Sequence, residues 1–161
     1  MSYDSDALAG LDEFLGRILA SLTPAQRRRA ALKLGQALRR SNLARIAANV
    51  EPDGGAMEAR KARRDRRGRL RRKAGGKMFA RLRYARNFRI EARSDSVEIA
   101  PAGAIARLAA VHHFGEEDIV GRLRDGRVIR TRYPARRLLG FSREDQTLAL
   151  DIAAGLLDPS R

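Results

Sequence analysis

The apolar residues of the N-terminal third predict two consecutive helices. From Ala7 to Leu22, apolar residues recur every three or four positions, which indicates an amphipathic helix. Thr23, Pro24 and Gln26 then form the pattern of a capping box with proline at the first helical position. A second helix is therefore predicted from Pro24 to about Asn49. We expect the two helices to form a hairpin with almost no loop.

The predicted second helix changes its apolar face along its length. Its apolar residues share one face as far as Leu38, and those from Leu43 onward share another, turned by roughly a third of a turn. Either the helix bends near Ser41 and Asn42, or its two halves pack on different partners. Both a wrap around the protein's own core and a place in an assembly of subunits explain this pattern.

The middle of the chain predicts a β-hairpin between two helices. From Phe88 to Ile99, apolar residues alternate with charged ones on either side of Ser94-Asp95, so a hairpin with one face inward is expected. A short helix from Lys77 to Ala85 is predicted before it. Helical spacing returns from Pro101 to Gly115, and Gly115 is placed to end that helix.

The last third predicts a second hairpin and a final helix. Asp125-Gly126 is a strong turn signal, so two further strands are expected within Leu123 to Tyr133, whereas the acidic Glu116 to Gly121 is expected to be a loop. Ser142 is placed to cap a helix from Arg143 to Leu157. The chain is therefore predicted to be α+β: an N-terminal helical hairpin and a small antiparallel sheet of about four strands, with helices packed on one side.

Charge adds a feature that the apolar pattern does not show. The chain has 161 residues and a net charge of +15, and ten of the fourteen residues from Arg60 to Lys73 are basic. Such a run cannot bury itself and its charges repel one another. We expect one domain over residues 1–161, with a mobile basic loop at about 54–76. The candidate partner or DNA contacts are Arg60, Lys61, Arg63, Arg64, Arg66, Arg67, Arg69, Arg71, Arg72 and Lys73.

The basic run has three interpretations. It is a solvated loop that keeps the protein soluble, or it binds nucleic acid through phosphates, or it contacts an acidic protein neighbour. Phosphate binding needs no particular spacing and would be salt-sensitive and weakly specific. The lack of interleaved aromatic residues argues against base stacking.

Catalytic and metal chemistry have no convincing candidate in the sequence. There is no Cys, no phosphate-cradling Gly loop and no nucleophile elbow, so we expect neither an enzyme nor a cofactor. His112-His113 lies near acidic residues, but adjacent helical residues point about 100° apart, which favours a hydrogen-bonded core or interface His112 over a metal site. No apolar run approaches the roughly 18 residues of a membrane span, and the N-terminus lacks a signal-peptide pattern. We expect a soluble protein with no membrane partner.

Several segments, taken in order, resemble the phage virion morphogenesis family of tail completion proteins of contractile-tailed phages. They are Ile46 to Gly54, Arg60-Lys61, Met78-Phe79, Leu82-Arg83, Ile105-Ala106, Val111 to Gly115 and Tyr133 to Ser142. The match runs over roughly residues 25–157. The ordered set carries the resemblance, and the dense Arg run departs from the family pattern.

The resemblance implies a structural role late in tail morphogenesis, at the head-proximal end, so that a finished tail can join a filled head. The family is similar in layout to neck and tail-terminator proteins that form rings, often hexameric. The implied partners are other copies of the chain, tail tube, sheath or neck proteins, and DNA in the neck channel. The implied location is the virion tail or neck, after assembly in the host bacterial cytoplasm. The alternative is a nucleic-acid-binding protein acting through residues 60–73.

The family-motif residues are candidate interface residues. A heterologous ring would suit a long helix with two apolar faces. Arg136 or Arg137 is expected to pair with an acid on a neighbouring subunit. The full candidate set is Pro52, Asp53, Gly54, Met78, Phe79, His112, Gly115, Pro134, Arg136 and Arg137.

Overall fold

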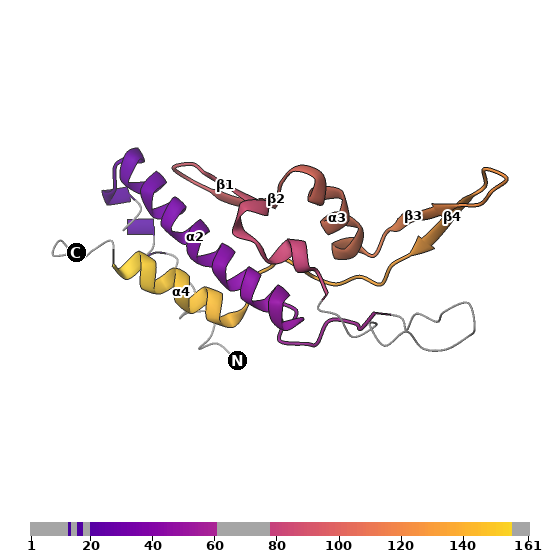
Figure 1. The fold of residues 1–161 in the computed structure, drawn as a ribbon. Coiled ribbons are helices and arrows are strands. Elements are labelled where there is room, and N and C mark those ends of the chain that lie inside the picture. Colours follow the sequence, from indigo (N-terminus) through magenta and orange to yellow (C-terminus); the bar gives the residue numbers. More distant parts are fainter. Residues whose placement is uncertain (1–12, 14–15, 18–19, 61–77, 156–161) are drawn as a thin grey trace. The chain divides into compact units, whose positions relative to one another are not determined.

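The computed structural model describes residues 13, 16–17, 20–60 and 78–155 and has an α+β fold. The elements in chain order are helix α2 (Pro24–Ala48), strands β1 (Phe88–Ala92) and β2 (Val97–Pro101), helix α3 (Ala106–Phe114), strands β3 (Glu117–Arg122) and β4 (Val128–Arg132), and helix α4 (Arg143–Ala154) (Figure 1). Short 3-10 helices span Ala80–Arg83, Ala85–Asn87 and Gly103–Ile105. Most of the helix predicted from Ala7 to Leu22 and the basic run after Arg60 lie outside the described residues.

The α+β class is confirmed, and the strands are divided differently from the prediction. In the part of the chain that the structure describes, four strands form two separate two-stranded sheets, β1-β2 and β3-β4, instead of one sheet. The predicted loop at Glu116 to Gly121 is wrong, because β3 occupies most of it. The acidic residues of this segment suggested a loop. In the strand, Glu117 lies opposite Arg132 in the antiparallel register, and a cross-strand pair of opposite charges is favourable.

The chain divides into two compact units. Unit 1 contains Met1–Leu38, Ile90–Ile99 and Arg143–Arg161, and unit 2 contains Arg39–Arg89 and Ala100–Ser142. Helix α2 is continuous and contributes its first part to unit 1 and its last part to unit 2. This division falls where the sequence predicts the change of apolar face.

The start of α2 is fixed by the predicted capping box. The backbone N–H of Gln26 donates to Thr23 Oγ1 at 3.3 Å, and the backbone N–H of Thr23 donates to Gln26 Oε1 at 2.8 Å. These reciprocal bonds satisfy donors that would otherwise be orphaned at a helix start. The prediction of a helix beginning at Pro24 is confirmed.

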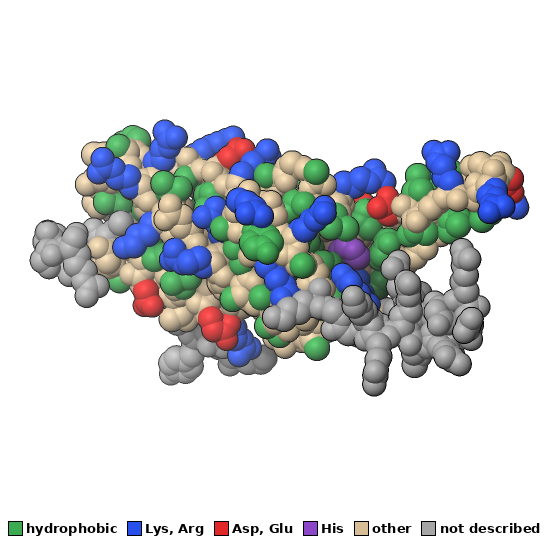
Figure 2. Space-filling view, in the orientation of Figure 1, with side chains coloured by type: hydrophobic (Ala, Val, Ile, Leu, Met, Phe, Trp, Pro, Cys, Tyr) green, Lys and Arg blue, Asp and Glu red, His purple; other side chains and the backbone are tan. Residues whose placement is uncertain are grey.

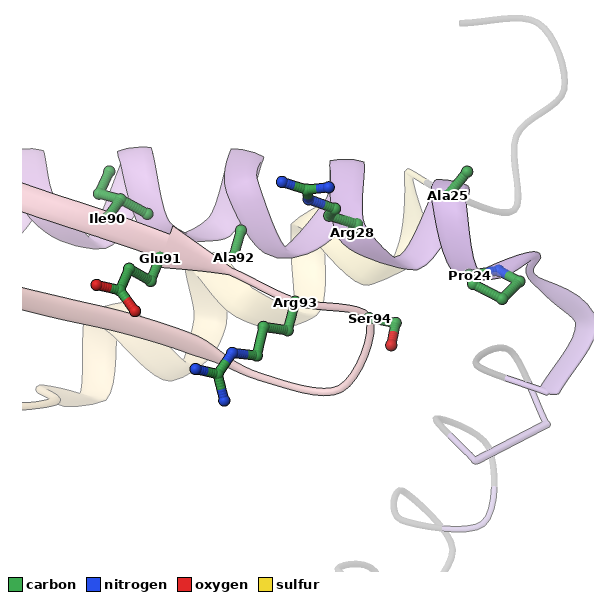
Figure 3. Close-up of a pocket in the computed structure, with 8 residues that line it drawn as sticks. All are labelled: Pro24, Ala25, Arg28, Ile90, Glu91, Ala92, Arg93 and Ser94. Atoms are coloured by element: carbon green, nitrogen blue, oxygen red, sulfur yellow. The ribbon is translucent and has the colours of Figure 1, made fainter.

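In unit 1, α2 packs closely on the β1-β2 hairpin. A Cβ atom at Gly35 would lie 2.7 Å from the Cγ2 atoms of both Ile90 and Val97, so only glycine fits there. Figure 3 shows Ile90 and Ala92 directed toward α2 and Glu91 directed to the opposite side, as the alternation in the sequence predicts. A hollow of about 690 Å³ is lined by the start of α2, by the end of β1 and by the first residues of the turn after β1.

The core of unit 2 includes residues on both sides of the basic run. Met57 precedes the run and Met78 follows it, and each is buried. Other buried apolar residues of this unit include Ile46, Phe79, Leu82, Phe88, Ile105, Ala109, Val111 and Leu138. Within the described residues, no helix is long and apolar enough to cross a membrane.

Candidate assembly site

The turn after α2 is held by its own backbone. Val50 pairs with Ala56 in an antiparallel bridge, and the N–H of Glu51 donates to the carbonyl of Gly55 at 2.7 Å. Gly54 has a φ of 87°, in the left-handed region that glycine adopts without strain. The Pro-Asp-Gly exit from the long helix is therefore a closed turn that reverses the chain.

Residues 133–142 carry the longest of the family-motif segments and form neither helix nor strand. Backbone carbonyls and side chains of other segments both accept hydrogen bonds from their backbone N–H groups. The N–H of Leu138 donates to His113 Nδ1 at 3.2 Å, and the N–H of Gly140 donates to Asn42 Oδ1 at 3.0 Å. A β-strand satisfies its backbone groups by pairing with an adjacent strand. This irregular segment cannot do so, and each of its buried backbone groups needs its own polar partner.

Gly140 packs closely against the turn after α2. A Cβ atom at Gly140 would lie 2.6 Å from Cγ of Pro52, which is buried. Arg45 of α2 donates from Nη2 to the carbonyl of Gly140 at 2.7 Å and from Nη1 to Ser142 Oγ at 3.3 Å. One arginine thus joins the end of α2 to the end of the segment.

Arg136 is the most buried charged side chain of the segment. It is 3% exposed, and its Nε donates to the carbonyl of Glu58 at 2.6 Å. Its Nη2 donates to the carbonyl of Ala59 at 3.2 Å, and its Nη1 lies 3.3 Å from His112 Nδ1. No ion pair of Arg136 is present among the described residues. Burial lowers its pKa from the ordinary value, and the nearby Glu58 partly opposes this.

Arg136 contacts residues that precede and residues that follow the basic run in the sequence. Glu58 and Ala59 lie immediately before the run, and Phe79 follows its last residue, Lys73, by six positions. The guanidinium carbon of Arg136 is 6.0 Å from the centroid of the Phe79 ring. Residues 61–77 therefore connect two anchors that contact the same side chain.

Arg137 points to the turn after α2. Its Nε donates to Glu51 Oε2 at 2.9 Å, and its Nη2 forms an ion pair with Asp53. The backbone N–H of Gly55 is the main cause of a lowered pKa for Asp53, with Arg137 contributing next. Arg137 itself is exposed, so this contact closes the framework at the surface.

The two histidines of α3 contact this framework on different sides. His112 packs edge-on against Phe79 and Tyr133, with ring centroids at 5.1 and 4.7 Å. Burial lowers its pKa below the ordinary 6.5, and the charge of Arg136 lowers it further; burial likewise lowers the pKa of His113. In the described part of the chain, no group of His, Asp and Glu residues is arranged to hold a metal ion.

Stability should depend on these histidines between pH 7 and 5. Because folding depresses both pKa values, the unfolded chain takes up protons first as the pH falls below 6.5, and the free energy of unfolding decreases. The chain has only two histidines, so the double variant His112→Gln/His113→Gln should have a flatter profile in this window. Chemical denaturation at pH 5, 6, 7 and 8 measures the slope. An unchanged slope in the double variant would contradict the assignment.

The structure gives the candidate residues from the sequence several different positions. Met78, Phe79, Pro52 and Arg136 are buried supports of the framework. Asp53, Gly54 and Arg137 are exposed at the turn after α2, and Gly115 ends α3 in the left-handed conformation. Pro134 lines a hollow of about 460 Å³ with Phe114 and Tyr133. Arg60 is exposed, and the remaining basic candidates, Lys61 to Lys73, lie outside the described residues.

Sequence reasoning missed the polar residues of α2 that hold residues 133–142. Asn42 is buried and lies four positions from both Leu38 and Ile46, which are buried too. This i, i+4 spacing places it on the buried stripe, which was the available signal. Arg45 gave no signal, because an arginine near the end of a helix is usually solvated.

The motif residues therefore form one connected framework in unit 2. These are the segments on which the sequence resembles a known family. Residues 6–158 match the phage virion morphogenesis family, and the chain belongs to it. It is similar to the tail completion protein S of Escherichia phage P2: the two are 33% identical over 150 residues, covering 91% of this chain and 95% of that protein. No solved structure matches. The resemblance noted from the sequence is confirmed.

Proposed function

We propose that this protein completes the phage tail at its head-proximal end and supports the joining of the tail to a filled head. The observation that carries the proposal is the similarity, over almost the whole of both chains, to a protein named for tail completion. The virion tail or neck is the corresponding location, with assembly in the host bacterial cytoplasm.

The framework around Arg136 supports a binding role without catalysis. His112 and His113 each use Nδ1 for a contact inside the chain, to Arg136 and Leu138. Glu51 and Asp53 are paired with Arg137. A catalytic site needs an acid, base or nucleophile free to meet a substrate, whereas these groups hold segments of the chain together. We accordingly propose a structural protein that acts through surfaces.

A ring of identical subunits is the arrangement we propose for assembly. Two large apolar side chains within the motif segments are exposed: Phe114 is 68% exposed and Phe141 is 63% exposed. Exposed apolar surface of this kind is typical of contacts between proteins. In a heterologous ring, different surfaces of one subunit meet those of the next. The proposed partners are copies of the chain, tail tube, sheath or neck proteins, and DNA in the neck channel.

The test of the function is genetic. A phage from which this gene has been deleted should yield separate full heads and overlong or unjoined tails in electron micrographs of lysates. Supplying the intact gene on a plasmid should restore joined virions and serves as the control. Normal virions from the deletion phage would rule the proposal out.

The alternative function is nucleic-acid binding through the basic run, favoured by its density of ten cations in fourteen residues. Replacing Arg63, Arg64, Arg66 and Arg67 with Gln should weaken binding to any duplex. The slope of log affinity against log salt should flatten by about 0.9 for each phosphate that the variant no longer neutralises. Fluorescence anisotropy with a labelled duplex at several salt concentrations measures both. If the wild-type protein shows no binding near physiological salt, this alternative fails.

A further inference from the structure

The β3-β4 hairpin exposes its apolar side chains instead of burying them. Ile119 is 44% exposed, Val120 50%, Leu123 45%, Val128 38% and Ile129 40%. Figure 1 shows the hairpin extending away from α3, the helix before it in the same unit. An isolated two-stranded ribbon is at best marginally stable in water. These side chains therefore form an uncovered surface on a projecting element.

The register places apolar and basic residues on one face of this ribbon. Ile119 lies opposite Arg130 and Val128 lies opposite Arg122, and residues opposite each other in an antiparallel pair share a face. Figure 2 shows hydrophobic side chains along the hairpin and Lys or Arg side chains toward its end. The face therefore has apolar side chains directly beside arginines.

Most acidic groups of the hairpin are already paired. Asp118 forms an ion pair with Arg107 of α3 at 2.9 Å, and Asp125 forms one with Arg127 at 2.6 Å. Glu117 lies opposite Arg132. The hairpin and its turn carry five arginines, Arg122, Arg124, Arg127, Arg130 and Arg132, and so keep an excess of positive charge.

We propose that the β3-β4 hairpin is a docking arm for another protein of the tail, whose surface is apolar at its centre and acidic around it. This inference rests on the proposed function and names the partner's chemistry. Contacts to phosphates use cations and leave apolar side chains uncovered, so a protein partner accounts for Ile119 and Val128 as well as for the arginines.

A second copy of this chain fits the arm less well. The chain carries a net charge of +15 and the arm itself is basic, so the surface of a second copy offers the arm little charge complementarity. Four of its described carboxylates, those of Glu51, Asp53, Asp118 and Asp125, are already paired with arginines of the same chain. An acidic partner of different sequence gives better charge complementarity.

The experiment uses tails purified from the deletion phage, treated with nuclease and mixed with the purified protein for co-sedimentation. Two variants test the arm: Ile119→Ser/Val128→Ser removes apolar area, and Arg122→Glu/Arg130→Glu reverses charge. Arg40→Glu/Arg93→Glu is the matched control, because it changes the same charge at exposed residues outside the hairpin. Circular dichroism checks that each variant is folded, and sedimentation velocity of the protein alone measures self-association.

The wild-type protein should sediment with the tails, and the affinity of both hairpin variants for the tails should be lower by about tenfold or more. The control should stay within about twofold of wild type, as expected for charges outside the contact. Arg122→Lys/Arg130→Lys should retain most of the binding. The proposal is overturned if no variant differs from wild type, if the wild type does not sediment with tails, or if its sedimentation depends on omitting nuclease. It is also overturned if the hairpin variants lose self-association in place of tail binding.

The two proposals fail in different ways. Intact virions from the deletion phage would remove the proposed function, whatever the hairpin variants do. If heads and tails stay separate while the hairpin variants bind tails as the wild type does, the docking arm alone is wrong.

Discussion

Replacing Arg136 with leucine should lower the free energy of unfolding by about 3 kcal/mol, because three buried acceptors lose their charged donor. This figure is the net effect, since removing the buried charge also relieves its desolvation cost. The acceptors are the carbonyls of Glu58 and Ala59 and the ring of His112. For a domain of this size, the change corresponds to a melting temperature lower by roughly 6–12 °C. Differential scanning calorimetry measures both quantities.

Two further variants show whether the geometry of the guanidinium matters. Arg136→Lys keeps a positive charge but presents a single nitrogen, so it should recover only part of the stability. Arg137→Ala should cost much less, since the side chains of Arg137 and its partner Asp53 are each more than half exposed. Equal stabilities of Arg136→Leu and Arg137→Ala would show that Arg136 does not hold this framework.

Replacing Gly115 with alanine should cost about 3 kcal/mol, the second large effect, from two sources that act together. Gly115 ends α3 with a φ of 71°, where a side chain is strained. An added Cβ atom would also lie 2.8 Å from the backbone nitrogen of Ala135, which cannot rotate away as a side-chain tip could. Thermal and chemical unfolding should agree on the size of the effect.

Gly126→Ala is the matched control for this variant. Gly126 has a φ of 86° and no atom within 4 Å of an added Cβ, so only the backbone strain remains. Its cost should be about 1 kcal/mol. If the two variants are destabilised equally, the close approach of Gly115 to Ala135 contributes nothing, and backbone strain explains both.

Local signals in the sequence predicted much of the fold. The capping box at Thr23, the turn at Asp125-Gly126 and the end of α3 at Gly115 each depend on neighbouring residues, and each is present. The division of the strands was not predictable in this way. Which strands pair is decided by contacts between distant segments. The acidic residues at the start of β3 suggested a loop, and the sequence did not indicate that Arg132 of β4 lies opposite Glu117.

The candidate site was predicted only as a set of residues. The resemblance indicated that Pro52, Phe79 and Arg136 matter, but not how they are connected. Arg136 contacts Glu58, which is 78 residues away in the sequence. The spacing of apolar residues within helices and strands cannot predict a contact over that separation. A role for Arg136 or Arg137 in pairing with a neighbouring subunit stays a prediction. Within the chain, Arg136 is buried and Arg137 is paired with Glu51 and Asp53.

Arg136 contacts described residues on both sides of residues 61–77. These contacts are made by Glu58 and Ala59 before the stretch and by Phe79 after it. Closing a loop between fixed ends costs only about 0.6 kcal/mol more for each doubling of its length. We therefore expect the fold to tolerate changes in the charge and length of this stretch, because the residues that Arg136 contacts lie outside it.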